Sequence, residues 1–139
     1  MDDVTLTKKI CALLGDIDGW EWRETGPAYA SAVVGVCYGR MPASPDRLVA
    51  VRVYLTDDNT QNLVSSRRVQ LRFRGARGDL DGADALADQA FARLQGLARE
   101  GGISGISRLS MTPLGADEND REERSDNYTI ILDNPEASS

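Results

Sequence analysis

The residues with the greatest potential for chemistry are carboxylates that occur close together. Asp57 and Asp58 are adjacent, and the segment 117–126 contains six acidic residues among eight charged ones. Carboxylates at strand ends hold the metal ions of many two-metal enzymes, so a metal-dependent enzyme that uses Asp57, Asp58 and Asp117 is one hypothesis. We favour a charged, solvated surface, because neighbours in sequence on a loop seldom converge on one metal ion. We therefore predict no catalytic residue, no metal site and no cofactor.

Three absences narrow the possible chemistry further. The chain contains no histidine, which excludes Ser-His-Asp and Cys-His nucleophiles and zinc sites that need imidazole. Its two cysteines, Cys11 and Cys37, lie far apart and lack a CxxC partner, so we predict buried thiols of a reducing compartment. The glycine-rich stretch 75–82 lacks the lysine and the spacing of a P-loop and predicts a turn from strand to helix.

A row of arginines follows the segment 67–75, "RRVQLRFRG". Its strict alternation predicts a strand with one face toward the core and one toward solvent. The residues predicted to face the core are Val69, Leu71 and Phe73. The residues predicted to face outward are Arg68, Gln70, Arg72 and Arg74. Like charges on one strand face repel each other unless acids lie opposite.

Two interpretations of this arginine row stay open. One is an ordinary solvated strand face. The other is an interface with a second copy of the chain, whose segment 117–126 supplies the acids; such a heterologous contact can close into a ring. The candidate interface residues are Arg68, Arg72, Arg74, Asp117, Glu118, Asp120, Arg121, Glu122, Glu123 and Arg124.

Two helices must position these residues. The spacing of apolar residues predicts a helix over 3–14, with Asp3 as its N-cap and Gly15 as its stop. A longer helix is predicted from the N-cap Asp81 to Gly101–Gly102. Its predicted apolar face consists of Ala83, Leu86, Ala87, Ala90, Phe91, Leu94, Leu97 and Ala98.

The remaining apolar segments predict strands. They are "GWEWRE", "ASAVVGVCYG", "RLVAVRVYL", "RRVQLRFRG", "ISGISRLSM" and "DNYTIIL". In the third, the residues predicted to face one way are Val49, Val51, Val53 and Leu55. Loops are predicted over 56–66 and 117–126. This order of elements predicts an α+β fold, in which a mainly antiparallel β-sheet packs against the N-terminal helix and the long helix.

Size and charge limit the class of protein. The 139 residues suit a single domain over 1–139, with 133–139 as a frayed tail. The net charge of −6 argues against a nucleic-acid binder, because such affinity comes mostly from neutralising phosphates. Neither a membrane span nor a signal peptide is evident, and we expect a soluble protein made in the cytosol.

The order of short motifs resembles the tail terminator proteins of long-tailed bacteriophages, which are also called minor capsid or tail-completion proteins. The similar features are a strand "VQLRFRG", a helix "ADALADQAFARLQGL", a strand running into "PLGAD", charged residues, and a final strand that begins "SDNY". The Pro-rich loop in "YGRMPASPDRLVAVRVYL" also fits. The resemblance covers residues 38–132, and its strength lies in the ordered combination of features.

The resemblance implies a structural protein of the virion that is assembled in the host cytoplasm. Such proteins form a ring, usually of six copies, which stops polymerisation of the tail tube. The implied partners are other copies of the chain, the major tail tube protein and a head-completion protein. DNA passes through the lumen without specific binding. On this hypothesis the segment 117–126 is a docking element held at its base by a strand. The main alternative is another phage neck component, such as a head-closure or head-tail joining protein.

Overall fold

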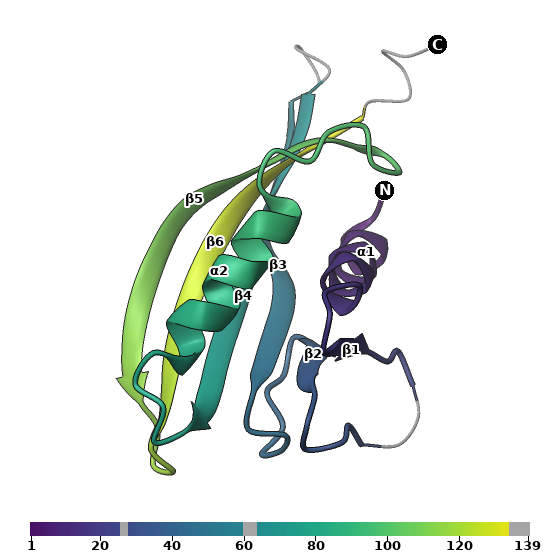
Figure 1. The fold of residues 1–139 in the computed structure, drawn as a ribbon. Helices are drawn as coiled ribbons and strands as arrows, with labels where there is room; N and C mark the ends of the chain where they lie inside the picture. Colours follow the sequence, from purple (N-terminus) through teal and green to yellow (C-terminus); the bar gives the residue numbers. More distant parts are fainter. Residues whose placement is uncertain (26–27, 60–63, 134–139) are drawn as a thin grey trace.

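The computed structural model describes residues 1–25, 28–59 and 64–133, and Figure 1 shows their fold. The helices are α1 (Asp3–Gly15) and α2 (Gly82–Leu94). The strands are β1 (Trp20–Trp22), β2 (Val34–Tyr38), β3 (Leu48–Asn59), β4 (Val64–Arg77), β5 (Ile103–Ala116) and β6 (Arg121–Leu132).

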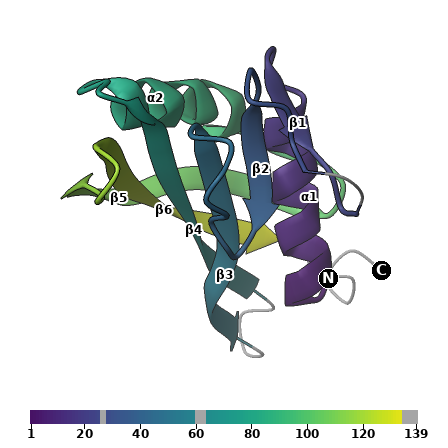
Figure 2. The same cartoon turned by 90° about the horizontal axis from the view of Figure 1, so that it is seen from below.

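The strands form one sheet in the order β1-β2-β3-β4-β6-β5. The pairs β1–β2 and β2–β3 are parallel, and the other three pairs are antiparallel. Both helices cover the same face of this sheet, and α1 lies over the parallel end (Figures 1 and 2). The predicted α+β class, with a mainly antiparallel sheet packed against two helices, is confirmed.

The N-cap of helix α1 lies one residue earlier than the sequence predicted. Its N-cap is Asp2, whose carboxylate accepts a hydrogen bond of 2.7 Å from the backbone N–H of Thr5. Asp3 is instead the first helical residue, and its carboxylate accepts a hydrogen bond from the guanidinium of Arg67 on β4. Gly15 is still helical, and Asp16 forms the C-cap.

Helix α2 is shorter than predicted, because it ends at Leu94 rather than at Gly101–Gly102. The backbone N–H of Gly96 donates to the carbonyl of Ile106, and the N–H of Ile106 donates to the carbonyl of Leu97. These bonds to β5 replace further helical bonds. As a result Leu97 only partly packs against the core, and Ala98 is exposed. Asp81 occupies the predicted N-cap position, but its side chain makes no capping hydrogen bond.

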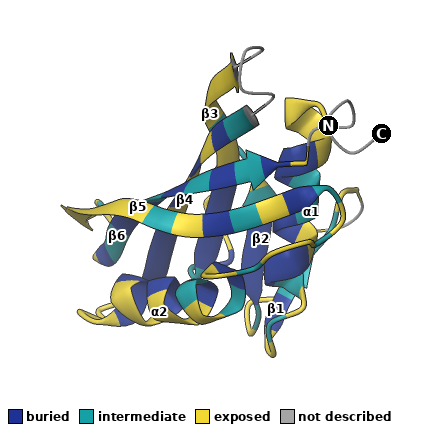
Figure 3. Ribbon diagram, turned by 90° about the horizontal axis from the view of Figure 1, so that it is seen from above, coloured by how far each residue is buried: buried dark blue, intermediate teal, exposed yellow. Residues whose placement is uncertain are grey.

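The core lies between the helices and the sheet (Figure 3). The three β4 residues predicted to face the core, Val69, Leu71 and Phe73, are fully buried. Phe91, by contrast, is only half-buried at the edge of this layer, so its predicted place in the core was wrong. The residues contributed to the core by α2 are Ala83, Leu86, Ala87, Ala90 and Leu94.

The strands run further than the sequence predicted. β3 and β4 extend through most of the predicted loop 56–66, of which residues 60–63 lie outside the described part. A β-bulge between Val53 and Leu55 turns Leu55 to the other face, where it is 45% exposed, so its predicted side was wrong. Of the tail predicted to be frayed, only Asp133 is described, and its N–H donates to the carbonyl of Gly102.

Candidate functional site

The charged segment 117–126 is mostly strand, which corrects the predicted loop. Only residues 117–120 form a turn, and β6 begins at Arg121. The carboxylate of Asp117 organises this turn, because its Oδ1 accepts hydrogen bonds from the backbone N–H groups of Asn119 and Arg121. Asp120 adopts a positive φ of 59°, which Asp tolerates better than most residues. Glu118, Asn119 and Asp120 are exposed at the tip of the β5–β6 hairpin.

Arg74 is buried, which corrects the prediction that it faces solvent. Its side chain is directed into the segment 42–46 between β2 and β3, with a fractional exposure of 4%. Its guanidinium donates hydrogen bonds of 2.8–3.3 Å to the backbone carbonyls of Pro42, Ala43, Pro45 and Asp46. Burial, together with repulsion from the charge of Arg121, lowers the pKa of Arg74.

Arg121, from the neighbouring strand β6, is directed into the same segment. Its Nη1 donates to the carbonyl of Ala43 at 2.7 Å and lies 3.2 Å from a carboxylate oxygen of Asp46. Its Nε donates to Asp117 at 2.9 Å, so the arginine also holds the hairpin turn. Two buried arginines therefore fasten the segment 42–46 to the end of the sheet.

A second buried charge cluster lies beneath α2. Asp126 is completely buried, and both of its carboxylate oxygens accept hydrogen bonds from Arg124. Arg124 also reaches Asp84 on α2 at 3.1 Å. The guanidinium of Arg108 lies 3.4 Å from Asp126 and 4.2 Å from the ring centroid of Phe91, within range of a cation–π interaction. This cluster attaches α2 to the sheet, so Arg124 serves within the chain.

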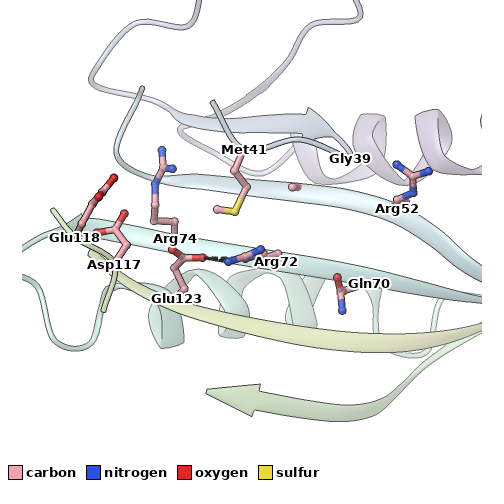
Figure 4. A pocket seen from close by; sticks show the side chains of 10 residues that line it. Gly39, Met41, Arg52, Gln70, Arg72, Arg74, Asp117, Glu118 and Glu123 are labelled. Carbon is pink, nitrogen blue, oxygen red and sulfur yellow. Dashed lines mark hydrogen bonds and ion pairs between the residues drawn. The ribbon is translucent and has the colours of Figure 1, made fainter. Parts of the chain in front are cut away.

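In the described part of the chain no helix covers the opposite face of the sheet, which contains a hollow of about 480 Å³. Figure 4 shows Arg72 pointing toward Glu123 on the adjacent strand. The two side chains form an ion pair of 2.6 Å. Arg68 and Arg52 are exposed and form no ion pair among the described residues. The residues that line the hollow are Gly39, Met41, Ala50, Arg52, Gln70, Arg72, Arg74, Asp117, Glu118 and Glu123.

The predicted interface residues therefore divide into three groups. Those engaged inside the chain are Arg74, Asp117, Arg121 and Arg124. Those with exposed side chains are Arg68, Arg72, Glu118 and Asp120, although Arg72 is paired with Glu123. Glu122 and Glu123 are half-buried. The burial of Arg74, Arg121 and Arg124 depends on segments distant in sequence, such as 42–46, which no local pattern reveals.

The hypothetical metal ligands do not converge. Asp57 and Asp58 lie within β3, where they alternate in direction, and Asp117 lies at the opposite end of the sheet. Asp58 binds Arg67 at 2.7 Å. No group of three or more potential ligands is found among residues 1–25, 28–59 and 64–133. In the same described ranges, no helix is long and apolar enough to cross a membrane.

Both cysteines are free, and only one of them is buried as predicted. Cys11 is fully buried on α1, and burial raises the pKa of its thiol to about 12. Cys37 is half-buried, and burial raises its pKa as well. A raised pKa suppresses the thiolate form that reacts with oxidants and electrophiles.

Sequence reasoning missed three arginines that matter for the site. Arg67 is buried and bonds to both Asp3 and Asp58. Arg108 stacks on Phe91, and Arg52 extends the cationic character of the open sheet face onto β3. Of these, only Arg52 had a usable signal, because it alternates with Val51 and Val53 in the predicted strand.

Comparison with known proteins agrees with this structure. The sequence profile of the family described as "Bacteriophage tail terminator protein" matches residues 13–134. No curated protein matches the chain. Among solved structures, a chain of the "Virion of native gene transfer agent (GTA) particle" has a similar fold, with a TM-score of 0.52 at 13% identity; the match covers 94% of this chain and 91% of that one. Because the family profile spans most of the sequence, this chain belongs to the bacteriophage tail terminator family and is a structural protein of a phage tail.

Proposed function

We propose that this tail protein forms a ring that ends polymerisation of the tail tube and joins the tail to a head-completion protein. The observation that carries the proposal is the family match over residues 13–134. The virion chain with a similar fold belongs to a particle that transfers genes, which supports a role within an assembled particle.

The exposed surfaces of the chain suit a structural protein that binds other subunits of a particle. Its open sheet face, its hairpin tip and the edge strand β5 are uncovered in the single chain. Within a ring, we expect the exposed members of the predicted interface set, Arg68, Arg72, Glu118 and Asp120, to lie at or near contacts between copies. The net charge of −6 supports passage of DNA without tight binding, since phosphates are attracted to cationic surfaces. Assembly would take place in the host cytoplasm, and the ring would remain in the virion.

The test is removal of the gene from the phage, followed by electron microscopy of the lysate. Loss of a tail terminator should give tails of abnormal length that do not join heads, and a plasmid copy should restore normal particles. Tails of normal length beside separate, DNA-filled heads would contradict termination and favour a head-closure role. Mass measurement of the isolated neck would give the copy number, which we expect to be six.

A further inference from the structure

The open sheet face carries a cluster of three exposed arginines. Arg52 of β3 lies directly opposite Gln70 of β4. Arg68 and Arg72 flank Gln70 on the same face of β4, two residues away on either side. Diagonal neighbours of this kind lie about 7–8 Å apart across a sheet, so the three side chains start from one small area of this face. The guanidinium of Arg52 lies beside Gly39, whereas that of Arg72 turns toward Glu123.

This arginine cluster is incompletely neutralised. Arg72 pairs with Glu123 at 2.6 Å, and Glu123 is the acid that Figure 4 shows beside it. Arg52 and Arg68 form neither an ion pair nor a side-chain hydrogen bond within the described part of the chain. Positive charges on one face of a sheet repel one another unless acids lie beside them. Two uncompensated arginines in a chain with net charge −6 therefore favour an acidic ligand from outside the molecule.

The chain itself presents an acidic surface on α2. Asp81, Asp84 and Asp88 follow one another at spacings of three and four residues, which places them on one side of the helix. All three are exposed, on the side opposite the buried residues of α2. Among the described residues Asp84 bonds to Arg124, whereas the carboxylates of Asp81 and Asp88 have no partner. Ala85 and Ala92 are exposed on this side of the helix, and their small side chains allow a partner to approach the helix backbone closely.

The two surfaces cannot meet within one molecule. The helices cover one face of the sheet (Figure 1), and Arg52 and Arg72 lie on the other face (Figure 4). Arg68 is on that same face, since it alternates with the buried Val69. Asp81 and Asp88 are exposed on α2, and Asp84 reaches Arg124 on the sheet face that the helices cover, so none of the three lies on the face that carries the arginines. The complementary charges can therefore pair only between two copies, in a head-to-tail contact that repeats from copy to copy.

We propose that the arginine cluster of one copy, Arg52, Arg68 and Arg72, binds the acidic side of α2, Asp81 to Asp88, on the next copy. This contact rests on the proposed ring and names the surfaces that form it. It differs from the contact predicted from sequence, because Arg74 is enclosed by segment 42–46 and the acids Asp117 and Glu123 are already paired.

Charge reversal tests the contact with two variants of the full chain. One carries Arg52→Glu with Arg68→Glu, and the other carries Asp81→Lys with Asp88→Lys. Each reversal places like charges together, which opposes binding strongly, so each variant alone should self-associate more than about tenfold more weakly than wild type in low-salt sedimentation velocity. Mixed together, the two variants should co-assemble, because every contact then joins opposite charges again. Arg99→Glu, an exposed arginine outside the cluster, is the matched control and should behave as wild type.

A photoreactive side chain at Gln70 detects the contact even if it is weak. When labelled and unlabelled protein are mixed, irradiation should cross-link the probe at Gln70 to residues 81–92 of another copy. A probe at the exposed Ser31 should not cross-link to these residues. The inference is overturned if Gln70 gives no adduct between copies, or if the mixed variants do not co-assemble. It is also overturned if the cluster instead binds a short DNA duplex and Arg52→Glu with Arg68→Glu abolishes that binding. Normal tail termination by the variant Arg52→Glu with Arg68→Glu would contradict this contact while leaving the proposed function intact. Normal tails after deletion of the gene would contradict the proposed function while leaving this contact between copies intact.

Discussion

At the scale of single residues, Arg72 and Arg74 show how similar sequence positions acquire different roles. They lie two residues apart on the same face of β4. Arg72 is half-exposed and pairs with one carboxylate, whereas Arg74 is enclosed and bonds to four backbone carbonyls. A buried hydrogen-bond donor contributes more to stability than an exposed ion pair, because removing the donor leaves buried carbonyl acceptors without partners.

We predict that Arg74→Met lowers the free energy of unfolding by about 2–4 kcal/mol, because the carbonyls of segment 42–46 lose their donor. Arg72→Met, the matched control on the same strand face, should cost less than about 1 kcal/mol. Urea titration followed by circular dichroism measures both values. Equal losses in the two variants would show that segment 42–46 does not depend on Arg74.

Tyr128 offers a second test at this scale. Its ring is fully buried, and its hydroxyl has no hydrogen-bond partner among the described residues. Burial, with a smaller contribution from the charge of Asp126, raises the pKa of Tyr128 to about 12. Removing an unsatisfied buried hydroxyl should be neutral or stabilise by up to about 1 kcal/mol. Tyr128→Phe should therefore keep or raise the urea midpoint. A loss above about 1 kcal/mol would mean that the hydroxyl has a partner, such as an ordered water.

At the scale of elements, one buried arginine connects α1 to the β3–β4 hairpin. Arg67 of β4 binds Asp3 at the start of α1 at 2.8 Å and Asp58 of β3 at 2.7 Å. Thr56 of β3 also donates to Asp3. These contacts join the N-terminal helix to strands more than fifty residues later in the chain, so part of the stability of α1 depends on ionised carboxylates.

This connection predicts a dependence of stability on pH. The hydrogen bonds from Arg67 and Ser65 lower the pKa of Asp58 from its ordinary value of 3.8. A carboxyl with a lowered pKa in the folded state stabilises the protein above its ordinary pKa, and this contribution is lost as the pH falls through the lower, folded value. Asp58→Asn should thus lower the melting temperature at neutral pH, and the difference from wild type should shrink below about pH 4.

The control for this prediction is a double-mutant cycle with Arg67→Met. In the Arg67→Met background, Asp58→Asn should have little effect on the melting temperature, because the partner of the carboxylate is gone. A difference between wild type and Asp58→Asn that stays constant down to pH 2 would rule out the pairing as its cause.

At the scale of the whole molecule, the core is a single layer between two helices and one face of the sheet. Phe73 of β4 lies at its centre and is fully buried, whereas Phe91 of α2 lies at its edge beneath the guanidinium of Arg108. Among residues 1–25, 28–59 and 64–133, no helix covers the opposite face of the sheet (Figure 2), and this asymmetry leaves that face available for contact with another copy.

We predict that the two phenylalanines differ in their contribution to stability. Phe73→Ala should cost about 3–5 kcal/mol, because it leaves a cavity in a layer that cannot collapse easily. Phe91→Ala should cost clearly less, since part of the ring is already exposed and the cation–π contact contributes only about 0.5–1 kcal/mol. Urea unfolding of both variants provides the comparison. A cost for Phe91→Ala as large as that for Phe73→Ala would place Phe91 in the core after all.

The sequence by itself determined the features that depend on local periodicity. The alternation in "VQLRF" identified the buried side of β4, and the spacing of leucines identified α1. The ordered motifs also led to the tail terminator family. These predictions succeed because the direction of a side chain follows from its position along a strand or helix, and the buried side must be apolar.

Only the tertiary structure decided which charged residues are free to bind a partner. Arg74 continues the outward alternation of β4, yet segment 42–46 encloses it from some thirty positions earlier in the chain. Helix α2 stops at Leu94 because β5 supplies hydrogen bonds to the residues that follow. The segment 117–126 looked like a solvated loop, but pairing with β4 and β5 makes most of it strand and buries Arg121, Arg124 and Asp126. Whether a long polar side chain is buried depends on which segment packs against its charged end. For these residues that segment comes from a distant part of the sequence.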